Sequence, residues 1–356
     1  MKKIVHIVPT FELGGVQAGI LYSIQELSAI YDFKILVVYG KKTNLIDSLP
    51  IHIQKSFIWT EANSLTKGWI KSYSILKKLQ PAIIISSLWK SVLVSVLFKI
   101  THKKTTLLGF YHSTKHAHFV DSLFLKLMSY FQDRALADST VTKEYIRKKY
   151  SINNTSVIFY QFNFKQLRSK EIKPASDVIK FVYFGRVTIS KGVKRAINFC
   201  KLCKLNGINF SFHIYGNGDL SLFKKQIAEL GLERDIFIND VLPLDQVIPT
   251  MREYDYLLQL SDYEGMALSV VEALNCGLVP IVTPVGEIVH YSRDGKNAIW
   301  LDEDFDKNLP MLVEKLKKVI NEPGLYQQLS LSGTLTFLET KKYVHAMKEV
   351  CDSFST

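Results

Sequence analysis

The feature that most constrains the fold of this chain is an alternation of short apolar runs with longer amphipathic runs. Apolar runs typical of buried strands occupy residues 4–8, 33–39, 82–86, 105–111 and 156–159, and they recur at 179–184, 210–215, 236–238, 256–260 and 279–283. Strands that alternate with helices form parallel sheets in doubly wound domains. The sequence therefore predicts an α/β protein with two Rossmann-like domains that face a central cleft.

The length of the chain supports a division into two domains. Its 356 residues exceed the size at which a single hydrophobic core stops growing. The polar and charged segment 165–177 separates the two series of strands and is the natural linker. We expect one domain over residues 1–165 and a second over residues 166–334.

The positive charge is concentrated in the first half of the chain. Residues 1–165 hold 22 Lys and Arg against 9 Asp and Glu, whereas the remainder holds 23 against 24. Such asymmetry usually marks a surface that meets an anion, either lipid, nucleic acid or an acidic substrate. No nucleic-acid-binding module is recognisable. The apolar runs 88–100 and 119–131 have basic rims, and we favour core helices over interfacial helices that dock on anionic lipid.

Cysteine usage and hydropathy bear on the compartment. The four cysteines are scattered, which indicates a reducing compartment, and the pair Cys200 and Cys203 lies in a helix-like run without a second pair. The apolar start of the chain is too short for a signal peptide, and no apolar run approaches the length of a membrane span. We expect a protein that is cytoplasmic or peripheral to a membrane.

Two acids lie eight positions apart around the start of a predicted helix. Glu264 precedes this helix beside Gly265, and Glu272 lies inside it. Eight helical residues rise about 12 Å, which is too far for two carboxylates to flank one bond as in a glycosidase. Glu272 has the residue type that accepts ribose hydroxyls in dinucleotide folds, although the helix dipole alone could favour an acid there. Glu264 could meet a sugar hydroxyl, with backbone N–H groups facing the same ring from Gly265, Met266, Ala267 and Leu268.

Cations and glycines follow two other strands. The strand 179–184 ends in Gly185-Arg186, and its loop reaches Lys191 before the next helix. Phosphates bind at such carboxyl ends of parallel strands, where Arg forks onto oxygens and Lys supplies a point charge. The pair Gly14-Gly15 opens the first helix and would let backbone approach a ligand's phosphates.

Three histidines and an acidic loop raise the question of a metal. His112, His116 and His118 follow the strand 105–111, but no second ligand cluster accompanies them. We favour a single catalytic or sugar-contacting histidine, His112, which lies nearest the strand end. The acidic segment 302–306 contains the pattern DxD, which we interpret as a solvated turn.

Taken together, these residues resemble glycosyltransferase family 4, the large retaining GT-B family with a Glu-x7-Glu motif. Gly185-Arg186, Lys191, the pair Glu264 and Glu272, and 277–280 (Gly-Leu-Val-Pro) appear in order over about a hundred residues. The resemblance implies that Arg186 and Lys191 neutralise a donor diphosphate and that Glu272 holds the ribose. It also implies that Glu264 and His112 touch the donor sugar and that Gly15 lies near the diphosphate. No metal and no other cofactor would be required, because the nucleotide sugar is a substrate.

The resemblance also implies a topology for the end of the chain. The segment 335–356 would form a helix that crosses back to the first domain. The chain departs from the family pattern at Gln17, where an acid is frequent, and at Met266-Ala267, where an aromatic and a small residue are usual. The second departure can reshape the sugar pocket.

The resulting prediction is a retaining, hexosyltransferase-type glycosyltransferase. It would move a sugar from a nucleotide sugar, with UDP favoured over GDP, to a lipid-linked or lipopolysaccharide acceptor of a bacterial surface glycan. It would work at the inner face of the cytoplasmic membrane, with an anionic membrane surface as a partner and without nucleic acid. The alternative is a non-catalytic scaffold or partner subunit that binds nucleotide sugars.

Overall fold

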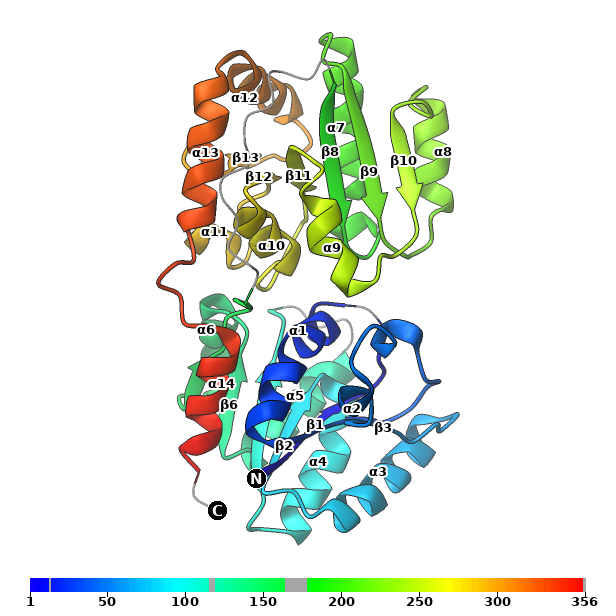
Figure 1. The fold of residues 1–356 in the computed structure, drawn as a ribbon, viewed down its shortest axis with the longest axis vertical. Coiled ribbons are helices and arrows are strands. Elements are labelled where there is room, and N and C mark those ends of the chain that lie inside the picture. Colours follow the sequence, from blue (N-terminus) through cyan, green and yellow to red (C-terminus); the bar gives the residue numbers. More distant parts are fainter. Residues whose placement is uncertain (13, 115–118, 164–177, 355–356) are drawn as a thin grey trace. The chain divides into compact units, whose positions relative to one another are not determined.

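The computed structural model describes residues 1–12, 14–114, 119–163 and 178–354. The chain divides into two compact units. Unit 1 comprises Met1–Phe162 and Lys341–Thr356, and unit 2 comprises Asn163–Thr340. In each unit helices lie on both faces of a twisted sheet (Figure 1). The expected linker 165–177 falls outside the described residues.

Unit 1 is built on a parallel sheet. Its described strands are ordered β3-β2-β1-β4-β5-β6-β7, and every pair is parallel. The strands are β1 (Lys3–Val8), β2 (Asp32–Val37), β3 (Phe57–Trp59), β4 (Ile83–Ser87), β5 (Thr106–Tyr111), β6 (Arg134–Ala137) and β7 (Thr155–Val157). The helices are α1 (Gly15–Ile30), α2 (Ile51–Gln54), α3 (Leu65–Leu79), α4 (Trp89–Thr101), α5 (Phe119–Phe131), α6 (Thr140–Tyr150) and α14 (Tyr343–Asp352). The strand order reverses between β1 and β4, which marks the ligand-binding switch point of such sheets.

Unit 2 repeats this plan. Its described strands are ordered β10-β9-β8-β11-β12-β13, again all parallel. The strands are β8 (Ile179–Phe184), β9 (Phe210–Tyr215), β10 (Ile236–Asn239), β11 (Tyr256–Gln259), β12 (Val279–Val282) and β13 (Ile299–Trp300). The helices are α7 (Val193–Leu205), α8 (Ser221–Glu229), α9 (Leu244–Met251), α10 (Leu268–Cys276), α11 (Ile288–Tyr291), α12 (Leu309–Asn321) and α13 (Pro323–Leu335). Here the switch point lies between β8 and β11.

Burial explains why these segments form a parallel sheet. All five residues of β4, and all four residues of β11 and of β12, are buried. A strand that is covered by helices on both faces reads as a continuous apolar run, which is the pattern that the sequence displays. The fold is thus the predicted α/β class with two Rossmann-like units.

The end of the chain differs from the expected helix over 335–356. Helix α13 ends at Leu335, and α14 begins only at Tyr343. Contacts within unit 1 hold α14: the Lys2 ammonium donates to the carbonyl of Cys351 at 2.9 Å, and the Tyr31 hydroxyl donates to Asp352 at 2.7 Å. None of the helices in the described ranges has the length and apolar character needed to span a membrane.

Candidate functional site

The loop after β8 places Lys191 beside the end of β11. The loop passes Gly185 and Arg186, forms a 3₁₀ turn over Ile189–Lys191 and reaches Gly192, the residue before α7. Gly192 has φ 72°, and a Cβ built there would lie 1.7 Å from the carbonyl oxygen of Leu260. No side chain fits at that distance. Glycine therefore allows the two loops to touch, and this contact fixes the backbone position of Lys191.

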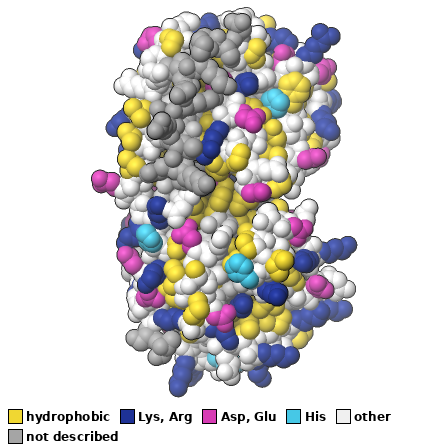
Figure 2. Space-filling view, in the orientation of Figure 1, with side chains coloured by type: hydrophobic (Ala, Val, Ile, Leu, Met, Phe, Trp, Pro, Cys, Tyr) yellow, Lys and Arg dark blue, Asp and Glu magenta, His cyan; other side chains and the backbone are white. Residues whose placement is uncertain are grey.

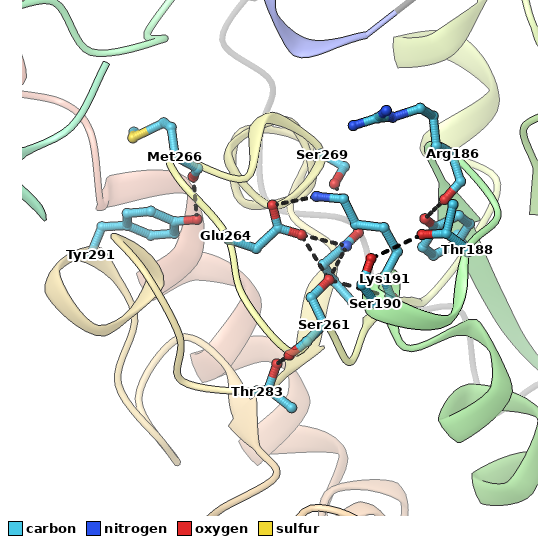
Figure 3. A network of polar contacts seen from close by, with 12 residues as sticks. Arg186, Thr188, Ser190, Lys191, Ser261, Glu264, Met266, Ser269, Thr283 and Tyr291 are labelled. Atoms are coloured by element: carbon cyan, nitrogen blue, oxygen red, sulfur yellow. Dashed lines mark hydrogen bonds and ion pairs between the residues drawn. The ribbon is translucent and has the colours of Figure 1, made fainter. Parts of the chain in front are cut away.

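Glu264 is the centre of a polar network in this loop cluster (Figure 3). The Lys191 ammonium lies 2.7 Å from Oε2 of Glu264. Oε1 accepts from the Ser261 hydroxyl at 2.7 Å and from the Gln259 amide at 3.0 Å. Glu264 is buried, with 7% of its surface exposed. The carboxylate is thus held on both oxygens before any ligand arrives.

Arg186 supplies a second cation at the same edge. Its carbonyl accepts from the Tyr183 hydroxyl at 2.6 Å, so its backbone is fixed. Its side chain is exposed, and Figure 3 draws the guanidinium without a contact to the other residues shown. A guanidinium in this position remains available for an anion, whereas the Lys191 ammonium already pairs with Glu264 and has further N–H donors to offer one.

The start of α10 presents backbone donors next to Glu264. Ala267 adopts a left-handed conformation (φ 55°), and its carbonyl accepts from Val270 and Val271. Within the part of the chain that the structure describes, the N–H groups of Gly265, Met266 and Ala267 donate to no protein acceptor. Such donors at a helix N-terminus suit a polar or anionic ligand.

The remaining residues of this segment have structural contacts. Met266 is buried, and its carbonyl accepts from the Tyr291 hydroxyl at 2.9 Å. Leu268 is the first residue of α10, and Glu272 is buried one turn further into that helix. Gly265 is held through its carbonyl, which accepts from the Glu287 N–H at 3.0 Å. The loop is therefore anchored by its carbonyls and by buried side chains.

A second group of candidate residues lies at the carboxyl edge of the sheet in unit 1. Gly14 precedes α1, and a Cβ built on Gly15 would lie 4.0 Å from the ring of Tyr160. The Tyr160 hydroxyl lies 3.0 Å from Nδ1 of His112, which follows β5. Tyr160 thus connects the glycine turn with His112. Burial lowers the pKa of His112 to about 3, so that its ring is neutral at physiological pH.

The structure therefore separates the predicted residues into two groups. Arg186, Lys191, Glu264 and the start of α10 belong to unit 2, whereas Gly14, Gly15 and His112 belong to unit 1. Sequence reasoning missed Gln259, Ser261 and Tyr160. The first two are polar residues at the end of an apolar run, which is a signal that could have been used. Gln17 also has a local role, because its side-chain amide donates to the carbonyl of Thr10 at 3.1 Å.

The acidic and cysteine motifs have ordinary surroundings. In the acidic loop, Asp302 pairs with Lys315 and Asp306 pairs with Arg195. Cys200 and Cys203 are buried in α7, and burial raises the pKa of Cys203 to about 12. Over the described ranges, no three His, Cys, Asp or Glu residues are grouped as metal ligands. His116 and His118 lie outside those ranges.

Comparisons with known proteins converge on one enzyme class. Residues 164–334 match the family described as Glycosyl transferases group 1. This match lies in unit 2 and contains Arg186, Lys191, Glu264 and Glu272. It covers somewhat less than half of the chain.

Curated relatives are also glycosyltransferases by name. The chain is 25% identical over 126 residues to a GDP-mannose:cellobiosyl-diphosphopolyprenol alpha-mannosyltransferase from Xanthomonas campestris, with 35% of this chain and 33% of the relative aligned. It is 27% identical over 170 residues to the amylovoran biosynthesis glycosyltransferase AmsK from Erwinia amylovora, with 45% and 39% aligned. The chain thus spans about a third of the length of these two relatives.

Solved structures share the fold over almost the whole chain. The Anabaena protein HepE, in complex with UDP-glucose, has a TM-score of 0.79 at 14% identity and aligns over 99% of both chains. WaaG, a glycosyltransferase involved in lipopolysaccharide biosynthesis, has a TM-score of 0.72 at 14% identity, also over 99% of both chains. The fold of this protein is therefore the GT-B fold.

Proposed function

We propose that this protein is a retaining glycosyltransferase of the hexosyltransferase type that uses a nucleotide-sugar donor. The observation that carries the proposal is the cluster of Lys191, Glu264 and Arg186 beside the free backbone donors of α10. Cations and N–H groups at the carboxyl edge of a parallel sheet suit a diphosphate, and a preorganised carboxylate beside them suits sugar hydroxyls. The match of unit 2 to group 1 glycosyltransferases supports the same assignment.

The chemistry follows from where charge develops. The bond between the anomeric carbon and the leaving phosphate oxygen breaks, and a bond to the acceptor oxygen forms on the same face. The leaving phosphate takes the acceptor proton, which balances the step. Arg186 and Lys191 would stabilise the growing charge on the phosphate, an electrostatic effect worth several kcal/mol in comparable sites. Glu264 would hold a sugar hydroxyl, and Glu272 would hold the ribose. We expect no metal to be required.

For the donor we favour UDP over GDP. HepE is described in complex with UDP-glucose, whereas the name of the Xanthomonas relative specifies GDP-mannose. Both bases therefore belong in the test. Thermal-shift measurements with UDP, GDP, ADP and their sugars, on wild type and Glu272→Ala, identify the base, because ligand binding raises the melting temperature by mass action.

Turnover separates catalysis from mere binding. Release of nucleotide from the donor by the purified chain, lost in Glu272→Ala, supports the enzyme. Donor binding without any turnover, even with acceptor present, would leave the alternative of a non-catalytic scaffold or partner subunit. No shift with any nucleotide would refute the donor site itself.

We propose a lipid-linked or lipopolysaccharide glycan as the acceptor, with a peripheral position at the inner face of the cytoplasmic membrane. The name of the Xanthomonas relative specifies a cellobiosyl-diphosphopolyprenol, AmsK is named for amylovoran biosynthesis, and WaaG is described as involved in lipopolysaccharide biosynthesis. The excess of Lys and Arg in residues 1–165 supports contact with an anionic surface, and Figure 2 shows many of these cations exposed on unit 1. We expect no role in nucleic-acid binding.

Helix α5, which we expected to be a core helix, has only Asp121 and Met128 buried among its 13 residues, and it offers the apolar part of such a membrane contact. Phe119, Leu123 and Tyr130 are 84%, 57% and 71% exposed, and their spacing places them on one helical face with Lys126 nearby. Leu123→Asp should lower co-sedimentation with anionic vesicles at low salt. Leu331→Asp, which changes an exposed leucine of unit 2, should not. Equal binding to neutral and anionic vesicles would contradict the proposal that the cations of unit 1 contribute to the membrane contact.

A further inference from the structure

A buried chain of hydrogen bonds links four side chains in unit 1. The Ser87 hydroxyl, at the end of β4, lies 2.8 Å from Nε2 of His6 in β1 and 2.9 Å from Nε2 of His112. Nδ1 of His112 lies 3.0 Å from the Tyr160 hydroxyl. Ser87 therefore stands between two imidazoles, and both ring nitrogens of His112 already have protein partners. The chain runs along the carboxyl edge of the sheet, across its switch point.

The number of available protons restricts the direction of this chain. Ser87 has one hydrogen, so it donates to one imidazole and accepts from the other. If His112 carries its proton on Nε2, it donates to Ser87, Ser87 donates to His6, and Tyr160 donates to Nδ1 of His112. In the reverse direction the Tyr160 hydrogen would need another acceptor, and none is present among the described residues. The first arrangement satisfies the Ser87 hydroxyl, the Tyr160 hydroxyl and both nitrogens of His112, which favours it. It places the proton of the His6 ring on Nδ1, which donates to no protein acceptor among the described residues.

We propose that Ser87, His6 and Tyr160 are positioning residues that hold His112 as the neutral Nε2–H tautomer with a fixed ring plane. This inference rests on the proposed function, together with the family resemblance, which implies that His112 touches the donor sugar. It assigns His112 a passive role. With both nitrogens bound to the protein, the imidazole offers a ligand its carbon edge and the shape of the site, and it is neither a charged contact nor the proton acceptor of the transfer.

The surroundings of the chain keep it uncharged. The ring of His112 lies 4.1 Å from that of Phe110 on its own strand and 6.3 Å from that of Tyr160. Tyr160 contacts Tyr343 of α14, and burial raises the pKa of Tyr160, with the proximity of Tyr343 and of Asp138, after β6, adding to the rise. Burial lowers the pKa of His6 to about 3, and the proximity of His6 adds to the lowering at His112. The groups that face the two rings are thus aromatic or neutral, with one carboxylate at the Tyr160 end.

The direct test is nitrogen NMR of the histidine side chains in the full-length chain. In wild type, His112 and His6 should each show the signals of one neutral tautomer, without titration between pH 7.5 and pH 5.5. Ser87→Ala should produce a tautomer mixture at His112 and raise its pKa by at least about one unit, because the ring loses its partner and gains access to water. Ser87→Thr keeps the hydroxyl and should restore the wild-type signals. Ser95→Ala, which removes a buried hydroxyl bonded to Ser86 and not to a histidine, should leave them unchanged.

A second variant and a kinetic measurement keep the test valid if Ser87→Ala does not fold. Tyr160→Phe removes only the donor to Nδ1 and should shift the Nδ1 signal while the sheet remains intact. The dependence of kcat on pH should be flat from pH 5.5 to pH 7.5 in wild type, and in Ser87→Ala the acid limb of the profile should move to higher pH in step with the raised pKa of His112. A wild-type His112 that titrates near 6.5, or unchanged NMR signals in Ser87→Ala, overturns the inference. Since the NMR result requires no turnover, it stands or falls independently of the glycosyltransferase assignment.

Discussion

The contact at Gly192 allows a quantitative test of how the loop cluster is built. We consider Gly192→Ala against the control Gly207→Ala. The two glycines have almost the same backbone conformation, with φ 72° and φ 73°. The added Cβ would lie 1.7 Å from the Leu260 oxygen at position 192, whereas nothing lies within 4 Å at position 207. The pair therefore separates the cost of the left-handed conformation from the cost of the clash.

The two costs differ in origin and in size. A left-handed conformation costs an L-residue about 1–2 kcal/mol, and both variants bear it. Overpacking adds about 1–3 kcal/mol at Gly192 alone, because the neighbour is backbone that cannot rotate away. For a unit of this size, 1 kcal/mol corresponds to about 2–4 °C in melting temperature. We expect Gly192→Ala to melt lower than Gly207→Ala by about 2–12 °C.

The clash should also reach the site. The same Cβ would lie 3.0 Å from the N atom of Ser261, whose hydroxyl holds Glu264. Movement of this backbone displaces the carboxylate that pairs with Lys191, so we expect at least about tenfold weaker UDP binding in Gly192→Ala and none of this loss in Gly207→Ala. Thermal melting and isothermal titration calorimetry measure both effects. Equal melting temperatures and equal nucleotide affinities in the two variants would refute the role assigned to Gly192.

Three further predictions concern charge. Glu264→Gln keeps the shape of the side chain and the bond from Ser261 but releases Lys191, so turnover should fall about 100-fold while UDP binds at least as tightly. Calorimetry measures the UDP affinity and nucleotide release measures turnover; a parallel loss of affinity and turnover contradicts the prediction. Glu272→Ala should lose binding of the nucleoside diphosphate but not of inorganic pyrophosphate, because only the ribose contact is removed; competition assays distinguish the two. His6 and His112 have lowered pKa values in the folded chain, so below about pH 6.5 they take up protons only when the chain is unfolded. The free energy of unfolding should therefore fall as pH falls. From pH 7 to pH 5.5 the two histidines together should lower it by roughly 2.5 kcal/mol, as measured by urea unfolding. A free energy of unfolding that does not change between pH 7 and pH 5.5 would contradict the burial of the two histidines as neutral rings.

Long buried strands were predictable because their pattern is unambiguous. The run 179–184 coincides with β8, and 210–215 coincides with β9. The short strands β3 and β13 escaped detection, since two or three residues show no period. The helix expected over 335–356 was placed too early at its start, because α14 begins only at Tyr343. Local patterns determine the interior of an element better than its ends.

The candidate site could be predicted only in part. Lys191 and Glu264 were each identifiable as charged residues at strand ends, but their 2.7 Å contact bridges 73 positions of sequence. It depends on the close approach of two loops at Gly192, which no spacing reveals. The bonds of Ser87 likewise connect residues of three neighbouring strand segments that only the sheet order brings together. Residue type indicates which side chains can do chemistry, whereas topology decides which of them meet.

The return of the chain to unit 1 has a practical consequence for dissecting the protein. Unit 2 is one continuous segment, whereas unit 1 is assembled from both ends of the chain. Truncation before Lys341 removes α14 and deprives Lys2 and Tyr31 of their partners. Unit 2 is therefore the unit to express by simple truncation. The other half requires residues 1–162 joined by a designed linker to residues 341–356, as in a protein from which an inserted domain has been excised.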